Sequence, residues 1–397
     1  MDLLNDWLVA LLRWGHVLAG ITWVGTSFYF NWFDLSVRKA EGPVIKENVR
    51  GTLTEVHGGS FYYHEQFWPS EEPPRMLHHS GPAQLTFLTG GLLLAMIYWL
   101  GAGTYLIDAQ VMDLSPWAAV AISAASLALG WLLYHRLCLM VESDRLVFAI
   151  MVLAVSLAGW GYLQVFNPRA ALLHMGALLG TIMALNVVFV IVPNHIGMRE
   201  QIRSSKPLDT NLGEKAKRHS QHNNYFTLPV VFAMVGIHFP LAFGHPLAWL
   251  VLPLVMVAGV AFRHFRNVQM QHDKTDYRLL AGGLALLALA IAVTFVDIRA
   301  TKVSTPAGQP SMEQAMSLIR AHCTPCHSRT PTDENFAEAP AGLALDGLAD
   351  IKGKTAKIYE QTVRDRIMPL GNSTGMTEEE RALLGIWLKS EDLSERE

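Results

Sequence analysis

Eight long runs of apolar residues constrain this chain more than any other feature of its sequence. A helix needs about 20 mostly apolar residues to span about 30 Å of hydrocarbon, and most of these runs reach that length. A membrane span must also satisfy its backbone hydrogen bonds internally. We therefore expect residues 1–300 to form an all-α, polytopic membrane helix bundle with about eight transmembrane helices. The runs cover residues 7–32, 82–101, 116–139, 146–166, 170–193, 225–243, 246–264 and 278–297.

The composition also indicates a membrane protein with a soluble tail. The 397 residues are 51% hydrophobic and 16% charged, whereas soluble domains carry about 25% charged residues. Residues 303–397 hold 10 Lys and Arg against 15 Asp and Glu, so the tail is acidic. No basic patch suggests nucleic acid, and the lipid bilayer is the first partner that the sequence indicates.

The distribution of Lys and Arg predicts the orientation in the membrane. The connections at 33–81 and 194–224 carry five and six of these residues, whereas those at 102–115 and 244–245 carry none. Cytoplasmic loops are enriched in Lys and Arg, so we expect the odd-numbered connections inside and both termini outside. This predicts a multi-pass protein of the bacterial inner membrane, with both termini and the C-terminal domain in the periplasm.

A second strong feature follows the last apolar run, in "RAHCTPCHSRT" (320–330). Cys323 and Cys326, with His327 directly after them, form C-x-x-C-H, the attachment site of a c-type haem. The alternative is a redox or zinc pair of cysteines. The adjacent histidine and the oxidising outer location favour haem. Cys323 and Cys326 would bond the porphyrin, and His327 would bind the iron.

The residues around this motif predict a small haem domain. A linker rich in small and polar residues is expected at 301–311. Residues 312–397 should hold a helix leading into the motif, a second helix near 355–367 and a third at 378–390, where Thr377 and Glu380 form a capping box. This arrangement is similar to a class I cytochrome c domain.

A methionine sulfur commonly completes the coordination of such an iron and raises its reduction potential. The segment "RIMPLGNSTGMT" offers Met368 and Met376. We favour Met368 because it directly precedes a proline, as in many such domains, whereas Met376 adjoins the capping box.

Three histidines lie within or at the ends of apolar runs, namely His16, His174 and His238. Ionisable groups inside a membrane are costly, which makes them functional candidates by default. The predicted topology puts all three in the outer half of the bilayer, on the side of the haem motif. Two of them could bind a b-type haem that passes electrons outward, or all three could hydrogen-bond to neighbouring helices. The sequence leaves both interpretations open.

Polar and aromatic residues also gather on the expected inner side. One connection contains "EVHGGSFYYHEQFWPSEEPPRMLHHSG" (55–81), and the other contains "RHSQHNNYFTLP" (218–229). The aromatic rings of the first could stack on a flat heterocycle, and the amides of the second could bind its edges. The alternative is an aromatic belt at the membrane interface.

Several stretches resemble the membrane-bound bacterial urate oxidases, also called urate hydroxylases, which carry a C-terminal cytochrome c. The resemblance covers nearly the whole chain. The His, Gly and Trp pattern near His16 also looks distantly like small membrane haem proteins of the protoporphyrinogen-oxidase type, which favours a haem b at His16. The stretches are "GHVLAGITWVGTSFYFNWFD" (15–34), "EVHGGSFYYHEQ" (55–66), "HNNYFTLPVVFAMVGIHFP" (222–240) and "CTPCHS" with "MPLGNSTGMT".

The resemblance implies oxidation of urate to 5-hydroxyisourate in purine catabolism, with water supplying the hydroxyl group. Haem c would pass the electrons to a respiratory acceptor such as a cytochrome c oxidase or a soluble cytochrome c. A group with a near-neutral pKa suits the general base of this reaction, and His64, His79 and His222 are candidates by position. The alternative is a quinol-linked membrane cytochrome without an organic substrate of its own. The face that urate approaches and the oligomeric state stay open.

Overall fold

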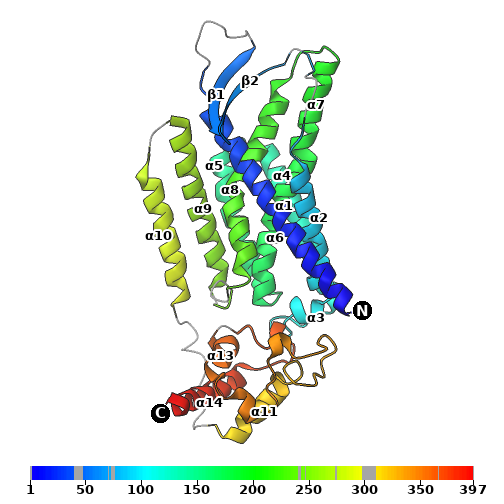
Figure 1. Ribbon diagram of the computed structural model, residues 1–397, viewed down its shortest axis with the longest axis vertical. Helices are drawn as coiled ribbons and strands as arrows, with labels where there is room; N and C mark the ends of the chain where they lie inside the picture. Colours follow the sequence, from blue (N-terminus) through cyan, green and yellow to red (C-terminus); the bar gives the residue numbers. More distant parts are fainter. Residues whose placement is uncertain are drawn as a thin grey trace.

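The computed structural model shows two bodies, a long helix bundle and a smaller C-terminal domain against one end of it (Figure 1). We refer to residues 2–296 as the helical body and to residues 310–396 as the C-terminal domain. The expected linker at 301–311 falls outside the described residues, except for Pro310 and Ser311. The structure describes residues 2–39, 48–69, 71–72, 77–239, 243–245, 247–272, 275–296, 310–364 and 366–396.

Long helices run along the helical body, and α1 (Asp2–Ser36) crosses its face diagonally in Figure 1. Two helices continue through short π-helical stretches, η1 (Leu94–Trp99) and η2 (Val187–Ile191). The other helices of this body are α2 (Gly81–Leu93), α3 (Ala102–Tyr105), α4 (Pro116–Met140), α5 (Asp144–Leu163), α6 (Pro168–Asn186), α7 (Val192–Arg203), α8 (Thr210–Gly236), α9 (Ala248–His272) and α10 (Tyr277–Thr294).

Seven helices in the described part of the chain are long and apolar enough to cross a membrane, one fewer than the eight expected. The missing one is the run at 225–243, which lies in α8. At 27 residues, α8 is about 40 Å long and could span a bilayer, but its first half carries charged, histidine and amide side chains. It packs between α6 and α9, where its histidine and amide side chains His219, His222, Asn223 and Asn224 are buried.

Two connections that were expected to be loops have regular structure. Within 33–81, β1 (Val49–His57) and β2 (Ser60–Phe67) form an antiparallel hairpin that turns at Gly58 and Gly59, both with positive φ. The fold is therefore not all-α. β1 is rich in β-branched residues, which favour strands, and a Gly-Gly pair suits a tight hairpin turn.

The prediction of a loop is also wrong for the second of these connections, 194–224. There α7 ends at Arg203, and α8 begins after Asp209, whose side chain accepts a hydrogen bond from the backbone N–H of Asn211 (3.0 Å). The stretch 218–229 is consequently helical and faces the bundle interior.

The core of the helical body is centred on α6. In the continuous helix Pro168–Arg203, 56% of the apolar 18-residue stretch is buried, whereas the corresponding share in α1 is 6%. Residues from α4, α5, α8 and α9 close around α6 in one hydrophobic cluster. α1 is thus a peripheral helix, and contacts that it makes with α8 and α9 involve a surface rather than the centre of the bundle.

The C-terminal domain has its own hydrophobic cluster, which includes Ile319, Leu384 and Trp387. The expected capping box is confirmed, because Thr377 N donates to Glu380 Oε2 (2.7 Å) and Glu380 N donates to Thr377 Oγ1 (3.2 Å). The elements of the C-terminal domain are α11 (Met312–His322), η4 (Pro340–Gly342), α12 (Leu348–Ile351), α13 (Thr355–Tyr359), η5 (Glu360–Arg364), η6 (Leu370–Asn372) and α14 (Glu378–Arg396).

The N-terminus and the C-terminal domain lie at the same end of the helical body, as Figure 1 shows. This end is named the docking end. The opposite end, where β1 and β2 lie, is named the hairpin end.

Candidate functional site

The C-x-x-C-H segment follows directly after α11, which ends at His322. Cys323 and Cys326 are free thiols, and both are partly buried. Burial raises the pKa of Cys323 to about 12 and that of Cys326 to about 11. A reactive dithiol pair needs a lowered thiol pKa instead. The surroundings of the two cysteines therefore do not resemble those of a redox dithiol.

His327 is oriented as an iron ligand would be. Its Nδ1 donates to the carbonyl oxygen of Leu343 at 2.9 Å. This bond fixes the tautomer and leaves the Nε2 lone pair available, which is the usual arrangement of a metal-ligating histidine. Together with the two thiols, this side chain fits a covalently attached haem.

The two candidate methionines differ in their surroundings. Met376 is fully buried and packs in the hydrophobic cluster of the C-terminal domain. Met368 is partly exposed on the segment after η5, and its carbonyl oxygen accepts a hydrogen bond from Arg381 Nη1 (2.6 Å). A ligand side chain must reach an open haem crevice, so Met368 is the better placed of the two.

The segment that carries both methionines is fixed on the helical body. Gln110 Nε2 donates to Gly375 O (3.0 Å) and to Met376 O (2.7 Å). A Cβ on Gly371 would stand 2.2 Å from the carbonyl oxygen of Thr104, so the two backbones touch there. The C-terminal domain thus docks through a specific backbone contact.

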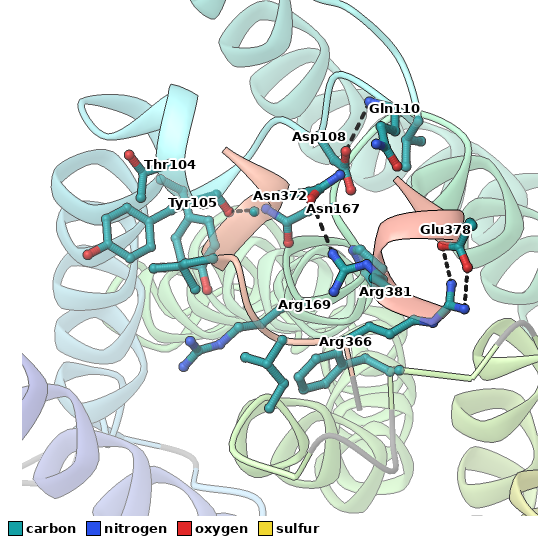
Figure 2. Close-up of a pocket in the computed structure, with 18 residues that line it drawn as sticks. Thr104, Tyr105, Asp108, Gln110, Asn167, Arg169, Arg366, Asn372, Glu378 and Arg381 are labelled. Atoms are coloured by element: carbon teal, nitrogen blue, oxygen red, sulfur yellow. Dashed lines mark hydrogen bonds and ion pairs between the residues drawn. The ribbon is translucent and has the colours of Figure 1, made fainter. Parts of the chain in front are cut away.

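A cavity of about 350 Å³ lies beside this contact, between the two bodies (Figure 2). The Arg381 guanidinium donates hydrogen bonds to Thr362 O, Met368 O and Asn372 Oδ1, and Arg366 forms an ion pair with Glu378. These charged side chains fix the segment 362–378. Arg169 Nε, by contrast, has no hydrogen-bond partner among the described residues. The charged and aromatic side chains that line the cavity include Tyr98, Tyr105, Asp108, Arg169, Arg366 and Arg381.

Among the three candidate histidines of the helical body, His16 is the one whose hydrogen bonding suits a metal ligand. Its Nδ1 lies 3.0 Å from the carbonyl oxygen of Thr86 and 3.1 Å from Thr89 Oγ1. Because a carbonyl oxygen accepts, Nδ1 carries the proton and the Nε2 lone pair is available. No described residue hydrogen-bonds to Nε2, and Gly20, one turn later, has open space where a Cβ would stand.

His174 does not fit a haem ligand. It is fully buried, its Nδ1 donates to Ala170 O (2.7 Å), and its Nε2 accepts from Ser123 Oγ (2.7 Å). Both ring nitrogens are used, so iron binding would require breaking one of these bonds. His238 lies just beyond the end of α8 and is exposed. The structure therefore does not present these histidines as a ready pair of ligands.

Among the three candidate bases, His64 has the most suitable contacts. Its Nε2 donates to Glu55 Oε1 (3.0 Å), and that carboxylate also accepts from Tyr29 Oη (2.8 Å). The hydrogen bond from Tyr29, followed by that from His64, lowers the pKa of Glu55 and keeps it ionised. His64 Nδ1 is left without a described partner. A carboxylate that orients a histidine is a recurring arrangement for a general base.

His222 belongs to a separate, buried network. Its Nε2 donates to Asp144 Oδ1 (3.1 Å), so its Nδ1 accepts from Tyr134 Oη (2.8 Å). Tyr134 in turn accepts from Asn186 Nδ2 (3.2 Å). Both ring nitrogens of His222 are engaged, which suits a fixed relay better than a base. His79 is exposed, with its ring 5.0 Å from that of Phe30.

Sequence reasoning missed one group of residues at the hairpin end. Arg263 on α9 is buried and contacts Asn224 on α8. The available signal was a charged residue at the end of an apolar run, where ionisable groups are expensive. The aromatic residues of the hairpin were expected to form a stacking surface, but Phe61 and Tyr63 are largely exposed.

The comparisons with known proteins give one match. The chain matches the family described as "Urate oxidase N-terminal" over residues 2–295. This range covers the helical body, and the C-terminal domain lies beyond it. No curated protein and no solved structure matches the chain.

Proposed function

The chain belongs to the urate oxidase N-terminal family, and on that premise we propose that it oxidises urate and passes the electrons to a haem c. The observation that carries the proposal is the combination of two parts. The family match spans the helical body, and the C-terminal domain presents two thiols and a correctly oriented His327 directly after α11. The first part supports urate as the substrate, and the second supports haem c as an electron acceptor other than oxygen.

The proposed reaction balances without oxygen. Urate and one water molecule give 5-hydroxyisourate, two protons and two electrons. The C–O bond forms between the water oxygen and the purine ring, and the electrons leave one at a time because a haem iron accepts a single electron. Cys323, Cys326, His327 and Met368 would hold haem c, which would supply one-electron transfer to a respiratory-chain acceptor.

His64 is the group of this chain that best fits the proton transfer. The ionised Glu55 holds its Nε2, and Nδ1 can take a proton from urate or from the attacking water. A carboxylate that is hydrogen-bonded to one ring nitrogen orients the imidazole, so that the other nitrogen can accept a proton. Tyr29 fixes the carboxylate from α1, so the base is oriented by two elements.

We further propose that the helical body spans the bacterial inner membrane with the hairpin end in the cytoplasm. Seven helices have suitable length and composition, and the Lys-rich and Arg-rich connections lie at the hairpin end. Urate would then bind at the cytoplasmic end, while haem c lies at the docking end. Along α9, Arg263 at the hairpin end lies about 22 Å from Ala248 at the start of the helix. Electrons must therefore pass between the two ends through a relay.

His16 fits a ligand of such a relay group. Its free Nε2 and the neighbouring Gly20 suit a b-type haem, which would supply one-electron transfer between the two ends. His174, with both nitrogens hydrogen-bonded, is assigned a structural role instead.

The experiment is rapid mixing of the purified, oxidised protein with urate in the absence of oxygen, with haem c reduction followed in the visible spectrum. The proposal predicts reduction by urate. If a quinol reduces haem c rapidly and urate does not, the protein is a quinol-linked cytochrome and the proposal is wrong.

A further inference from the structure

A buried guanidinium on α9 has no counter-charge. Arg263 is 7% exposed, and no carboxylate among the described residues forms an ion pair with it. Its guanidinium lies 3.9 Å from the centre of the Phe28 ring on α1, and its Nε donates to Asn224 Oδ1 on α8 (2.7 Å). An aromatic face compensates a cation only in part. A buried charge without an ionic partner is strongly unfavourable, so a partner for this one is expected.

Two hydrogen-bond donors at this place are also unused. Arg263 Nη2 and Asn224 Nδ2 are both buried and have no hydrogen-bond partner among the described residues, and Asn224 is 2% exposed. Because Arg263 Nε donates to Asn224 Oδ1, the two side chains form one hydrogen-bonded pair, and each of them carries one of the unused donors. Buried donors are normally satisfied, and each exception needs an explanation. Two free donors beside an unpaired cation match an acceptor that carries negative charge.

The surroundings connect this pair to the candidate base. Phe28 touches Arg263, while the next residue, Tyr29, donates to Glu55, the partner of His64. The arginine and the His64–Glu55 pair are thus held by consecutive residues of α1.

α9 is further tied to α1 and α8 one turn after Arg263. Asn31 Nδ2 donates to Asn267 Oδ1 (3.0 Å), and Asn267 Nδ2 donates to Tyr225 Oη (3.2 Å). Amide contacts of this kind hold the three helices in register without supplying a charge. The positive charge of Arg263 is therefore still uncompensated after its neighbours are counted.

We propose that Arg263 and Asn224 form the recognition site for a planar organic anion with carbonyl oxygens, and that the urate monoanion is its ligand. This identification of the ligand rests on the proposed function. A guanidinium and an amide that are joined by a hydrogen bond offer donors that match the edge of a flat ring with carbonyl oxygens and a deprotonated nitrogen. The ligand supplies the missing negative charge and accepts from Nη2 and Nδ2, and its binding removes both defects of the free protein.

The test uses the full-length, haem-loaded protein in detergent and three variants. Arg263→Gln removes the charge and keeps an amide. Asn224→Asp places a carboxylate against the guanidinium and so supplies an internal counter-charge. Arg266→Gln is the matched control, since Arg266 lies on the same helix but is exposed and bonded to Gln269. Haem content and thermal unfolding report whether each variant folds.

Urate binding is measured by calorimetry, with hypoxanthine as a neutral purine control, and KM and kcat are measured from urate-dependent haem c reduction. Arg263→Gln and Asn224→Asp should each weaken urate binding and raise its KM by at least about tenfold. Asn224→Asp should melt at the same temperature as the parent or higher, because its new ion pair removes the unpaired charge. Arg266→Gln should leave urate affinity within about twofold of the parent.

The outcomes separate this inference from the proposed oxidation. If urate reduces haem c in all variants with unchanged KM, Arg263 is structural, and the inference is overturned while the function stands. If urate binds in an Arg263-dependent way but never reduces haem c, the anion site stands and the oxidation is wrong. If the parent binds hypoxanthine as tightly as urate, or binds neither, the anion site is wrong.

Discussion

Gly371 offers a sharp test of how the C-terminal domain is held. Its backbone has φ +59, and a Cβ there would stand 2.2 Å from Thr104 O, where ordinary contact needs 3.4–4 Å. In Gly371→Ala the domain must retreat by at least about 1 Å. Gly375→Ala is the matched control, because Gly375 has φ +67 but no atom within 4 Å of its Cβ position. Both variants pay about 1–2 kcal/mol for a left-handed alanine.

The two variants should differ by the loss of docking. Retreat of the Gly371 loop breaks the hydrogen bonds from Gln110 to Gly375 O and Met376 O. At about 1 kcal/mol each, their loss amounts to about 2 kcal/mol, or roughly a thirtyfold shift from docked to undocked.

The assay is stopped-flow reduction of haem c by urate, with hydrogen exchange at residues 104–110 as a direct measure of docking. Gly371→Ala should reduce haem c more slowly and exchange faster than Gly375→Ala, with an unchanged haem spectrum. Equal rates and equal exchange in the two variants would refute the docking contact as the route to haem c.

The remaining predictions concern the two haem candidates and the C-terminal domain. Met368→Ala should shift the haem c spectrum and lower its midpoint potential in a redox titration, whereas Met376→Ala should lower stability by about 2–5 kcal/mol by removing a core side chain; the opposite pattern would reassign the ligand. His16→Ala should remove non-covalent haem in a pyridine haemochrome assay, and His174→Ala should leave that haem in place. The N–H of Thr377 lowers the pKa of Glu380, so its charged form stabilises the fold above about pH 4.3 and this stabilisation is lost as the pH falls through the lowered pKa. Glu380→Gln should cost about 0.5–1 kcal/mol at pH 7 in denaturant titrations and nothing at acidic pH, and a cost that persists in acid would contradict the role of the charge.

Much of the helical architecture could be predicted because apolar length is a local property. The first half of α8 was the exception, since it buries polar side chains such as His222 and Asn224 by pairing them with neighbouring helices. A polar helix of this kind resembles a loop in composition, and its partners are distant in the chain. The hairpin could have been predicted from local signals, namely the Gly58-Gly59 pair and the β-branched residues of β1.

The candidate site was predictable to different degrees in the two bodies. The haem segment is a local pattern, so Cys323, Cys326 and His327 could be proposed as haem-binding residues from the sequence. The histidines of the helical body could not be ranked, because sequence does not show which ring nitrogens are already bonded. His174 and His222 have both nitrogens engaged, while His16 and His64 each keep one available. Tertiary hydrogen bonding makes that difference.

The central claim is that urate gives its electrons to haem c and takes its new oxygen from water. The most direct measurement is an anaerobic titration of the oxidised protein with urate in oxygen-labelled water, with haem c reduction and the product followed together. The account predicts two electrons delivered per urate, labelled oxygen in 5-hydroxyisourate and no hydrogen peroxide. If haem c stays oxidised until oxygen is admitted, and peroxide then forms with the product, the account is contradicted.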